Sequence, residues 1–316
     1  MKKKRAKNNG CQHIFSDVAS EWLADSKVRV KQSTYEKYVY ISEKHILPYF
    51  GNYDMKQLTI KALDEFIIYM LTEGKLKRNE GVSKKYLQDI LSIIRSIVGF
   101  CEQTYGITCK IRKLKRLRAE KPKVKTLNKS EKKKLAKELK KDTTPEKIGI
   151  MLGLYAGLRI GEVCGLRWKD YDESNGTITV NQTVQRISNN KGSTIFVISS
   201  PKTQSSQRVV PLPGFLAKAL SAARRKPDDP IVSVDNKYTE PSKLRRFFKR
   251  ITEACNIARM RFHDLRHTFA SDCARMNCDT KMLSELLGHA NVSITLDRYV
   301  HSDLDEKKEF MQRIKL

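Results

Sequence analysis

Two histidines and an arginine occur together in the segment Arg-Phe-His-Asp-Leu-Arg-His, as His263, Arg266 and His267. On a helix, His263 and Arg266 share one face, so an imidazole and a guanidinium could meet the same phosphate group. His263 and His267 also have the i, i+4 spacing of zinc ligands, but Asp264 replaces the glutamate of the His-Glu-x-x-His pattern. No carboxylate cluster in the sequence indicates a two-metal nuclease. The segment therefore favours phosphate binding over metal binding.

A second charged pair follows an apolar run of the sequence. Arg159 comes directly after the largely apolar residues 148–158, and Glu162 follows three residues later, where the next helix is expected to start. A cation in such a place is costly to bury unless it has a partner or an anionic ligand. Two interpretations are open: a structural pair of Arg159 with Glu162, or an anion-binding arginine. Taken alone, this feature favours the structural pair.

Three further residues have no evident function when each is considered singly. His289 follows a glycine, which is typical of a helix cap or of a hydrogen-bonded core group. A single tyrosine such as Tyr299 usually serves packing. Lys202 falls in a turn between two expected strands, where a lysine is ordinarily solvated. Residue type alone assigns no chemistry to these three.

The charge of the chain indicates a polyanionic partner. The 316 residues include 62 Lys and Arg against 35 Asp and Glu, a formal net charge of +27. Nucleic acid fits best, because clustered basic side chains release the counterions of a phosphate backbone. An acidic membrane surface is the competing partner, but no apolar run of about 18 residues is present to span a bilayer. We expect no membrane partner.

Cysteine usage and the first residues predict a cytoplasmic protein. Seven cysteines are an odd number, and no Cys-x-x-Cys pair occurs, so neither a disulfide framework nor a zinc knuckle is indicated. The basic residues 1–10 contain no apolar signal core. We expect a reducing compartment, the bacterial cytoplasm or nucleoid.

The elements that must position these residues divide into a helical part and a mixed part. Apolar positions at helical spacing predict four helices within residues 11–109, around residues 15–23, 35–46, 60–71 and 83–105. A boundary follows at residues 110–125, which contain nine Lys or Arg and Pro122. This stretch is predicted to be a linker that crosses a DNA backbone, with a merely solvated tether as the alternative. Its predicted DNA-binding residues are Lys110, Arg112, Lys113, Lys115, Arg116 and Arg118.

The second domain, residues 126–303, is expected to combine helices with a small sheet. Asn128 and Glu131 have the spacing of a capping box, and an apolar helix ends at Gly157. Short β-branched runs predict a three-stranded antiparallel sheet, with helices resuming after it. The fold class is therefore mainly α with a small antiparallel β-sheet (α+β). The three strands are expected at residues 176–180, 195–199 and 208–212, and helices at about residues 213, 241, 265, 280 and after 299.

Five short motifs, taken together, resemble the tyrosine recombinase (phage integrase) family in order, spacing and flanking residues. They are Ala-Gly-Leu-Arg-Ile-Gly-Glu, Pro-Lys-Thr, His-Asp-Leu-Arg-His, Leu-Gly-His and Asp-Arg-Tyr-Val-His. Five motifs in the correct order rarely arise by chance. The resemblance extends from about Lys125 to the end of the chain, and the helical first third resembles that family's core-binding, SAM-like domain only in pattern. It implies two domains that form a C-shaped clamp around DNA.

The resemblance also implies a mechanism and a set of site residues. Tyr299 would attack the scissile phosphate to form a 3′-phosphotyrosine, which keeps the bond energy in a covalent intermediate and requires no ATP. Two arginines would bind the phosphate, Lys202 would protonate the leaving 5′ oxygen, and a histidine would take up the proton of the phenol. No metal or other cofactor is expected. The implied catalytic residues are Arg159, Lys202, His263, Arg266, His289 and Tyr299, with Glu162 in a supporting position.

The biological role implied is integration or excision of a phage or other mobile element. The same chemistry would serve a chromosome-dimer or plasmid resolvase or a relaxing topoisomerase, and a non-catalytic DNA-binding regulator is the alternative from another class. Expected partners are double-stranded recombination sites and further copies of the chain, from dimer to tetramer on DNA, with accessory directionality or DNA-bending proteins as further candidates. The tail, residues 304–316, could dock on a neighbouring protomer through Leu304, Phe310 and Ile314. The short basic start favours an enzyme that acts on core sites.

Overall fold

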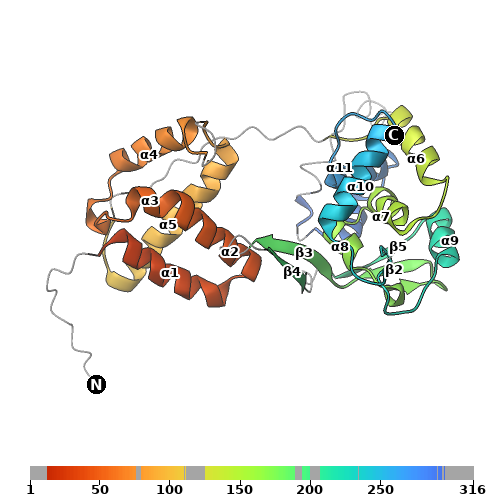
Figure 1. The fold of residues 1–316 in the computed structure, drawn as a ribbon, viewed down its shortest axis with the longest axis horizontal. Helices are drawn as coiled ribbons and strands as arrows, with labels where there is room; N and C mark the ends of the chain where they lie inside the picture. The colour runs from red at the N-terminus through yellow and green to blue at the C-terminus, as the bar shows by residue number, and fades with distance from the viewer. Residues whose placement is uncertain are drawn as a thin grey trace, which may run out of the picture. The chain divides into compact units, whose positions relative to one another are not determined.

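A computed structural model of the chain describes most of its residues. These are residues 13–75, 80–109, 111, 125–188, 194–199, 207–233, 235–289, 291–293 and 295. They divide mainly into two compact units, which meet in the sequence between Lys121 and Pro122 and are described separately below (Figure 1). Within the described residues, no helix is long and apolar enough to cross a membrane.

The first unit is helical, as the sequence predicts (Figure 1). Its longest helix begins after Ser83, whose hydroxyl accepts a hydrogen bond from the amide of Tyr86, and ends at Gly106 in the left-handed conformation. The apolar stripe predicted on this helix is buried against aromatic side chains of the other helices. The helices are α1 (Phe15–Arg29), α2 (Gln32–Ile41), the π-helical turn η1 (Ser42–Ile46), α3 (Leu47–Phe50), the 3₁₀ turn η2 (Met55–Gln57), α4 (Ile60–Thr72) and α5 (Lys84–Tyr105).

The second unit is built around helix α7 (Pro145–Tyr155), which is buried from Lys147 to Leu154. It packs against α6 (Lys129–Leu139), α8 (Ile160–Gly165), α9 (Gly214–Ala222), α10 (Pro241–Ala254) and α11 (Phe262–Arg275). The last described helix, α12 (Thr280–Leu287), packs on α11. The predicted capping box is confirmed at α6, where Asn128 and Glu131 each bond the other's backbone amide.

The strands that follow α8 pair differently from the predicted three-stranded sheet. Strands β2 (Thr177–Val180) and β5 (Arg208–Pro211) pair antiparallel, as expected, but the third strand of their sheet is the short β1 (Tyr171–Asp172), after the 3₁₀ turn η3 (Trp168–Asp170). The predicted strand 195–199 belongs instead to a separate two-stranded ribbon of β3 (Thr183–Ser188) and β4 (Thr194–Ser199). The prediction was wrong because β3 was missed, and β4 pairs with its neighbour in the chain.

A tight turn links α7 to α8 and determines where the first candidate residue lies. Gly157 has φ +66°, and a Cβ placed on it would lie 2.5 Å from Cδ1 of Phe269. Only glycine fits such a left-handed, closely packed position. Two residues later Arg159 is the N-cap of α8, with its side chain beside the first turn of that helix.

Candidate active site

Arg159 and Glu162 form the pair that the sequence offered as one interpretation. The backbone amide of Arg159 donates to Oε2 of Glu162 (2.9 Å), and Nη1 of Arg159 donates to Oε1 (2.7 Å). Glu162 is buried, with 7% of its side chain exposed, whereas 36% of the Arg159 side chain is exposed. The pair thus holds the guanidinium at Nη1, while part of the Arg159 side chain remains accessible to an anion.

Arg266 reaches the same region from α11. Its Nη1 donates to the carbonyl oxygen of Gly157 (2.9 Å) and its Nη2 to that of Leu287 (2.5 Å). The residue is only 1% exposed. A buried guanidinium needs several acceptors, and this one joins the end of α7 to the end of α12.

The end of α12 is where the candidate residues converge. Three consecutive carbonyl oxygens there each accept a hydrogen bond from a different arginine. The carbonyl of Leu286 accepts from Nε of Arg208 (2.8 Å), and that of Leu287 from Nη2 of Arg266 (2.5 Å). The carbonyl of Gly288 accepts from Nη2 of Arg159 (3.3 Å). The last carbonyls of a helix lack partners within the helix and carry its negative dipole end, so cations are favoured there. The next residue is His289.

The histidine that follows this turn has its own support. Its amide donates to the carbonyl of Ser284 (3.1 Å), and its Nδ1 lies 2.8 Å from Oγ1 of the fully buried Thr295. A hydrogen bond at Nδ1 fixes the ring plane and directs Nε2 to the opposite side. His289 is therefore held from both backbone and side chain.

Arg208 is a member of this cluster that the sequence analysis did not identify. Its Nη1 and Nη2 donate to the two oxygens of Glu162 (3.2 and 3.0 Å), and 6% of its side chain is exposed. The alternation of β5 contains a signal, because Arg208 and Val210 are the buried positions and Val209 is exposed. An arginine on the inward face of a strand requires a buried partner.

The electrostatics of the cluster keep Glu162 ionised. Burial raises the pKa of its carboxyl group, but the charge and hydrogen bonds of Arg208, followed by those of Arg159, outweigh burial and lower the pKa to about 2. Glu162 is therefore negatively charged at neutral pH.

His263 lies one helical turn before Arg266 and His267 on α11. Its ring and that of His267 are edge to face, with centroids 4.6 Å apart. Burial, then the neighbouring His267, Arg266 and Arg159, lower the pKa of His263 to about 4. The imidazole is thus neutral near pH 7 and able to accept a proton. Asp264, which lies between the two histidines in the sequence, is bound by Arg261. Among the described residues, no group of three or more His, Cys, Asp or Glu is arranged to hold a metal ion.

Several predicted site residues lie outside the described part of the chain. These are Lys202, Tyr299, the tail residues Leu304, Phe310 and Ile314, and the linker residues Lys110, Arg112, Lys113, Lys115, Arg116 and Arg118. Arg159, Glu162, Arg266 and His289 are brought together at the end of α12, and His263 lies near enough for Arg159 and Arg266 to lower its pKa.

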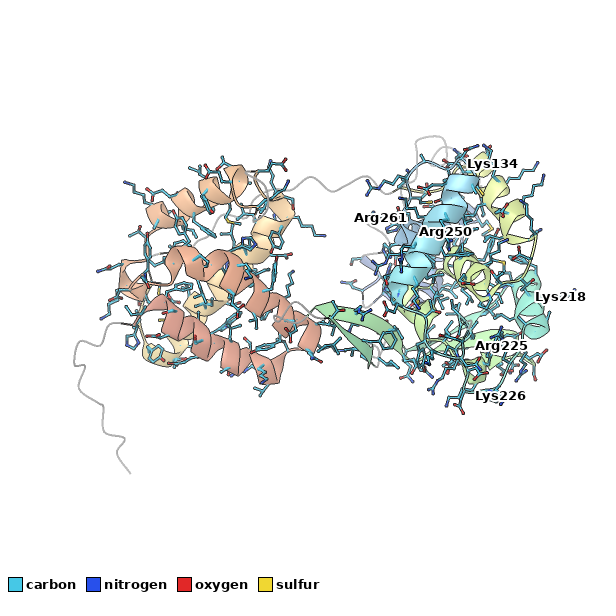
Figure 2. The ribbon with its side chains drawn as sticks, viewed as in Figure 1. Lys134, Lys218, Arg225, Lys226, Arg250 and Arg261 are labelled. Atoms are coloured by element: carbon cyan, nitrogen blue, oxygen red, sulfur yellow. The ribbon has the colours of Figure 1, made fainter. Side chains whose placement is uncertain are left out.

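Basic side chains on the described surface were also missed by the sequence analysis. On α10, Leu244 and Phe248 are buried, while five Lys and Arg are exposed. Among the basic side chains labelled in Figure 2, Lys134, Lys218 and Arg250 lie on α6, α9 and α10 respectively. The signal on α10 was its charge at helical spacing on the face opposite the apolar stripe. The five are Lys243, Arg245, Arg246, Lys249 and Arg250.

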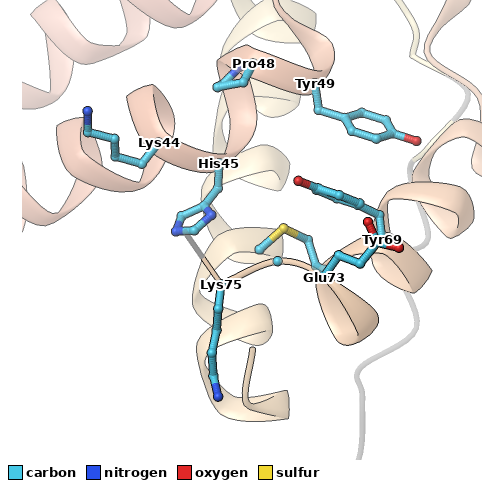
Figure 3. A pocket seen from close by; sticks show the side chains of 9 residues that line it. Lys44, His45, Pro48, Tyr49, Tyr69, Glu73 and Lys75 are labelled. Carbon is cyan, nitrogen blue, oxygen red and sulfur yellow. The ribbon is translucent and has the colours of Figure 1, made fainter. Parts of the chain in front are cut away.

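A cavity of about 110 Å³ in the first unit contains none of the predicted site residues. Its walls include Lys44, His45, Tyr49 and Lys75 (Figure 3). Burial lowers the pKa of His45, whose ring packs edge on against Tyr40 and Tyr86. These contacts are those of a core histidine.

The sequence profile of the phage integrase family matches residues 125–306, and that of the N-terminal SAM-like domain of phage integrases matches residues 14–71. The chain belongs to the phage integrase family. As a tyrosine recombinase of this family it is a DNA-binding enzyme of DNA recombination that breaks and rejoins DNA. Its mainly helical fold, with a helical N-terminal domain, is that of the family.

The relatives of this chain include integrases of mobile elements and Xer recombinases. The ICEBs1 integrase of Bacillus subtilis (strain 168) is 25% identical over 95% of this chain and 82% of its own length. A tyrosine recombinase XerC-like protein of Caldanaerobacter subterraneus is 28% identical over 77% of this chain, which spans 62% of that relative.

Solved structures share the fold of this chain. One is the Tn1549 transposon integrase in complex with circular intermediate DNA, with a TM-score of 0.75 and 22% identity, covering 95% of this chain and 99% of that one. Another is a lambda integrase tetramer bound to a Holliday junction, with a TM-score of 0.65 and 16% identity, covering 92% of this chain and 80% of that one.

Proposed function

We propose that this phage integrase recombines DNA at specific sites through a 3′-phosphotyrosine on Tyr299, and that it integrates or excises a mobile element. One observation supports this most strongly: Arg159, Arg266 and His289, from three separate segments, meet at one helix end. Two guanidiniums and an imidazole in one place suit the charge that develops on a phosphate during transfer.

Each residue has a role that its surroundings support. Arg159, partly exposed beside α8, binds a non-bridging phosphate oxygen. Arg266 is almost fully buried, so its contact with the phosphate requires a local movement. His263 is neutral at physiological pH and accepts the proton of the Tyr299 phenol, a group whose ordinary pKa is near 10. Loss of either phosphate-binding arginine is expected to raise the barrier by about 3 kcal/mol.

The remaining assignments concern His289 and two residues outside the described part of the chain, Lys202 and Tyr299. Lys202 is proposed to protonate the 5′ oxygen as it leaves, and His289 to hydrogen-bond the phosphate. With the 5′ hydroxyl free and the 3′ phosphate esterified to Tyr299, attack by that hydroxyl, or by one from a partner strand, restores a phosphodiester. These steps require no metal, no other cofactor and no ATP.

DNA contacts are proposed for the linker arginines and lysines named above and for the basic face of α10. Their summed charge, within a chain of net charge +27, favours binding to a phosphate backbone. The partners proposed are double-stranded recombination sites and further copies of the chain, from dimer to tetramer. In support, a lambda integrase of the same fold is described as a tetramer on a Holliday junction.

A resolvase role is the second candidate, because the relatives include XerC-like and XerA recombinases at 25–28% identity. It uses the same chemistry and differs in the joints that the enzyme makes. Family membership decides against a non-catalytic DNA-binding regulator.

The proposal is tested by trapping the covalent intermediate on a supercoiled plasmid that carries the gene with its flanking DNA. Wild-type enzyme stopped with detergent should yield a protein–DNA adduct whose peptide carries the nucleotide on Tyr299. Tyr299→Phe should yield none and still bind DNA, while Tyr40→Phe, which changes an exposed tyrosine of the first unit, should be unaffected. Sequencing the joints separates integration and excision from resolution.

Two results would contradict the proposal. Undiminished adduct in Tyr299→Phe would remove Tyr299 as the nucleophile. Cleavage that is lost in excess EDTA and restored by zinc would return the site to the metal interpretation of His263 and His267.

A further inference from the structure

Arg208 is a buried cation of the active-site region that has no role in the proposed chemistry. It begins strand β5, which packs against α12, and its guanidinium is used on two sides. One side binds both oxygens of Glu162, and Nε binds the carbonyl of Leu286. Only a planar guanidinium can bind a carboxylate with two nitrogens and a separate carbonyl with the third.

Each of these contacts leads to a phosphate-binding residue. Glu162, held by Arg208 on one side, holds Arg159 on the other through the bond to Nη1. Leu286 lies three residues before His289, at the end of α12 where Arg159 and Arg266 also bind. Arg208 therefore supports both the carboxylate that holds Arg159 and the turn that leads to His289.

The backbone of the turn is shaped to accept this side chain. Gly288 has φ +61°, and a Cβ placed on it would lie 3.0 Å from Nη1 and 3.1 Å from Cδ of Arg208. The absence of a side chain at this position lets the guanidinium pack directly on the backbone before His289. The contact is thus a fitted one rather than a chance approach of a long side chain.

We propose that Arg208 is a positioning residue for DNA cleavage, which fixes Arg159 through Glu162 and His289 through the Leu286–Gly288 turn. The inference rests on the phosphate-binding roles proposed above for Arg159 and His289. Without Arg208, the buried carboxylate of Glu162 keeps Arg159 as its one remaining cationic partner among the described residues, so the guanidinium of Arg159 is drawn away from the phosphate.

The test compares Arg208→Met, Arg208→Lys and the double variant Glu162→Gln/Arg208→Met. The probe is a nicked duplex built on the joint that the wild-type enzyme makes, and the measurement is the single-turnover cleavage rate at saturating DNA. Arg208→Met should cleave about a hundredfold more slowly with an unchanged Kd for DNA, because small displacements of catalytic groups have effects of this size. Arg208→Lys should fall between wild type and Arg208→Met, since it keeps the charge without the fork.

The double variant separates positioning from folding. Replacing Glu162 by glutamine removes the unbalanced carboxylate, so the double variant should cleave about tenfold faster than Arg208→Met. Lys147→Met is the matched control, because the side chain of Lys147 is 5% exposed, against 6% for Arg208, and binds Asp142 away from the site. It should lower the Tm of the protein without slowing cleavage.

The outcomes are decisive in both directions. Cleavage by Arg208→Met within about threefold of wild type, or an equal slowing in Lys147→Met, would overturn the positioning role. So would a double variant that cleaves more slowly than wild type by the product of the separate effects of Arg208→Met and Glu162→Gln, with Glu162→Gln measured alongside. A wild-type enzyme that forms no adduct would instead refute the proposed function, which distinguishes the two failures.

Discussion

Replacing Glu162 by glutamine should destabilise the second unit and change how its stability depends on pH. The carboxylate is 7% exposed and meets Arg159 and Arg208, the latter also buried. Glutamine keeps the size of the side chain but offers one acceptor oxygen and no charge. Removing one partner of a buried ion pair costs about 3–5 kcal/mol, because the remaining charge stays buried.

The pKa of Glu162 gives a second value for the stabilisation that its ionised carboxylate contributes to the folded state. The pKa of Glu162 falls from 4.5 to about 2 on folding, so the folded state binds the proton less readily than the unfolded chain. The resulting stabilisation is complete above the unfolded pKa and is lost as the pH falls through the folded pKa. A shift of this size corresponds to about 3 kcal/mol in full, of which about 1.4 kcal/mol is lost by about pH 3.5.

The assay is urea unfolding followed by the fluorescence of Trp168, in a Trp22→Phe background. The two tryptophans lie in different units, so this background reports on the unit that contains Glu162. The free energy of unfolding of the parent should fall between about pH 6 and about pH 3.5 by more than that of Glu162→Gln, the difference being about 1.4 kcal/mol. Glu253→Gln, which removes an exposed ion pair with Lys249, is the control and should follow the parent.

Parallel curves for the parent and Glu162→Gln over this range, with a loss at neutral pH below about 1 kcal/mol, would refute the reasoning. Such a result would mean that Arg208 and Arg159 find other acceptors at no cost. The contacts of Glu162 with the two arginines would then contribute little to the free energy of unfolding.

Three further predictions test the parts of the site separately. Burial and nearby cations lower the pKa of His263 to about 4. The cleavage rate constant at subsaturating DNA should therefore stay level from about pH 8 to about pH 5 and fall toward pH 4. An inflection near pH 6.5 would contradict the assignment of His263 as the proton acceptor. Thr295→Val, which removes the hydroxyl beside Nδ1 of His289, should slow cleavage about five- to tenfold while Thr295→Ser does not, and equal rates would exclude a role for this bond. Gly157→Ala should lower the free energy of unfolding by about 2 kcal/mol, since φ is +66° and Phe269 occupies the space, whereas Gly99→Ala, with open space around it, should raise it by about 0.5–1 kcal/mol in urea titrations.

The sequence predicted the elements better than it predicted their partners. The stripe from Leu87 to Cys101 and the box of Asn128 and Glu131 depend only on residues one or two turns apart, and both are confirmed. The pairing of the strands was wrong, because short β-branched runs do not specify which neighbour they join.

Arg208 shows why part of the site could not be found from the sequence. Its partners Glu162 and Leu286 lie 46 and 78 residues away, and no local pattern connects the three. The motifs identified Arg159, Arg266 and His289 through a resemblance, which names residues with conserved chemistry and omits those that only hold them. The alternation of β5 marks Arg208 as buried, but a partner becomes apparent only when β5 lies against α12.

The two interpretations of Arg159 that the sequence left open are compatible in the structure. Pairing with Glu162 was the structural alternative and anion binding the functional one, yet the paired guanidinium still exposes 36% of its side chain. Within the described part of the cluster, the guanidiniums of Arg159 and Arg208 share the carboxylate of Glu162, and that of Arg266 binds the carbonyls of Gly157 and Leu287. The three guanidiniums thus outnumber this carboxylate. Helix carbonyls offset this only in part, since a helix end carries about half a charge. An anion in this place would therefore complete the electrostatic balance, and a structural pair is what holds the arginine in position to receive it.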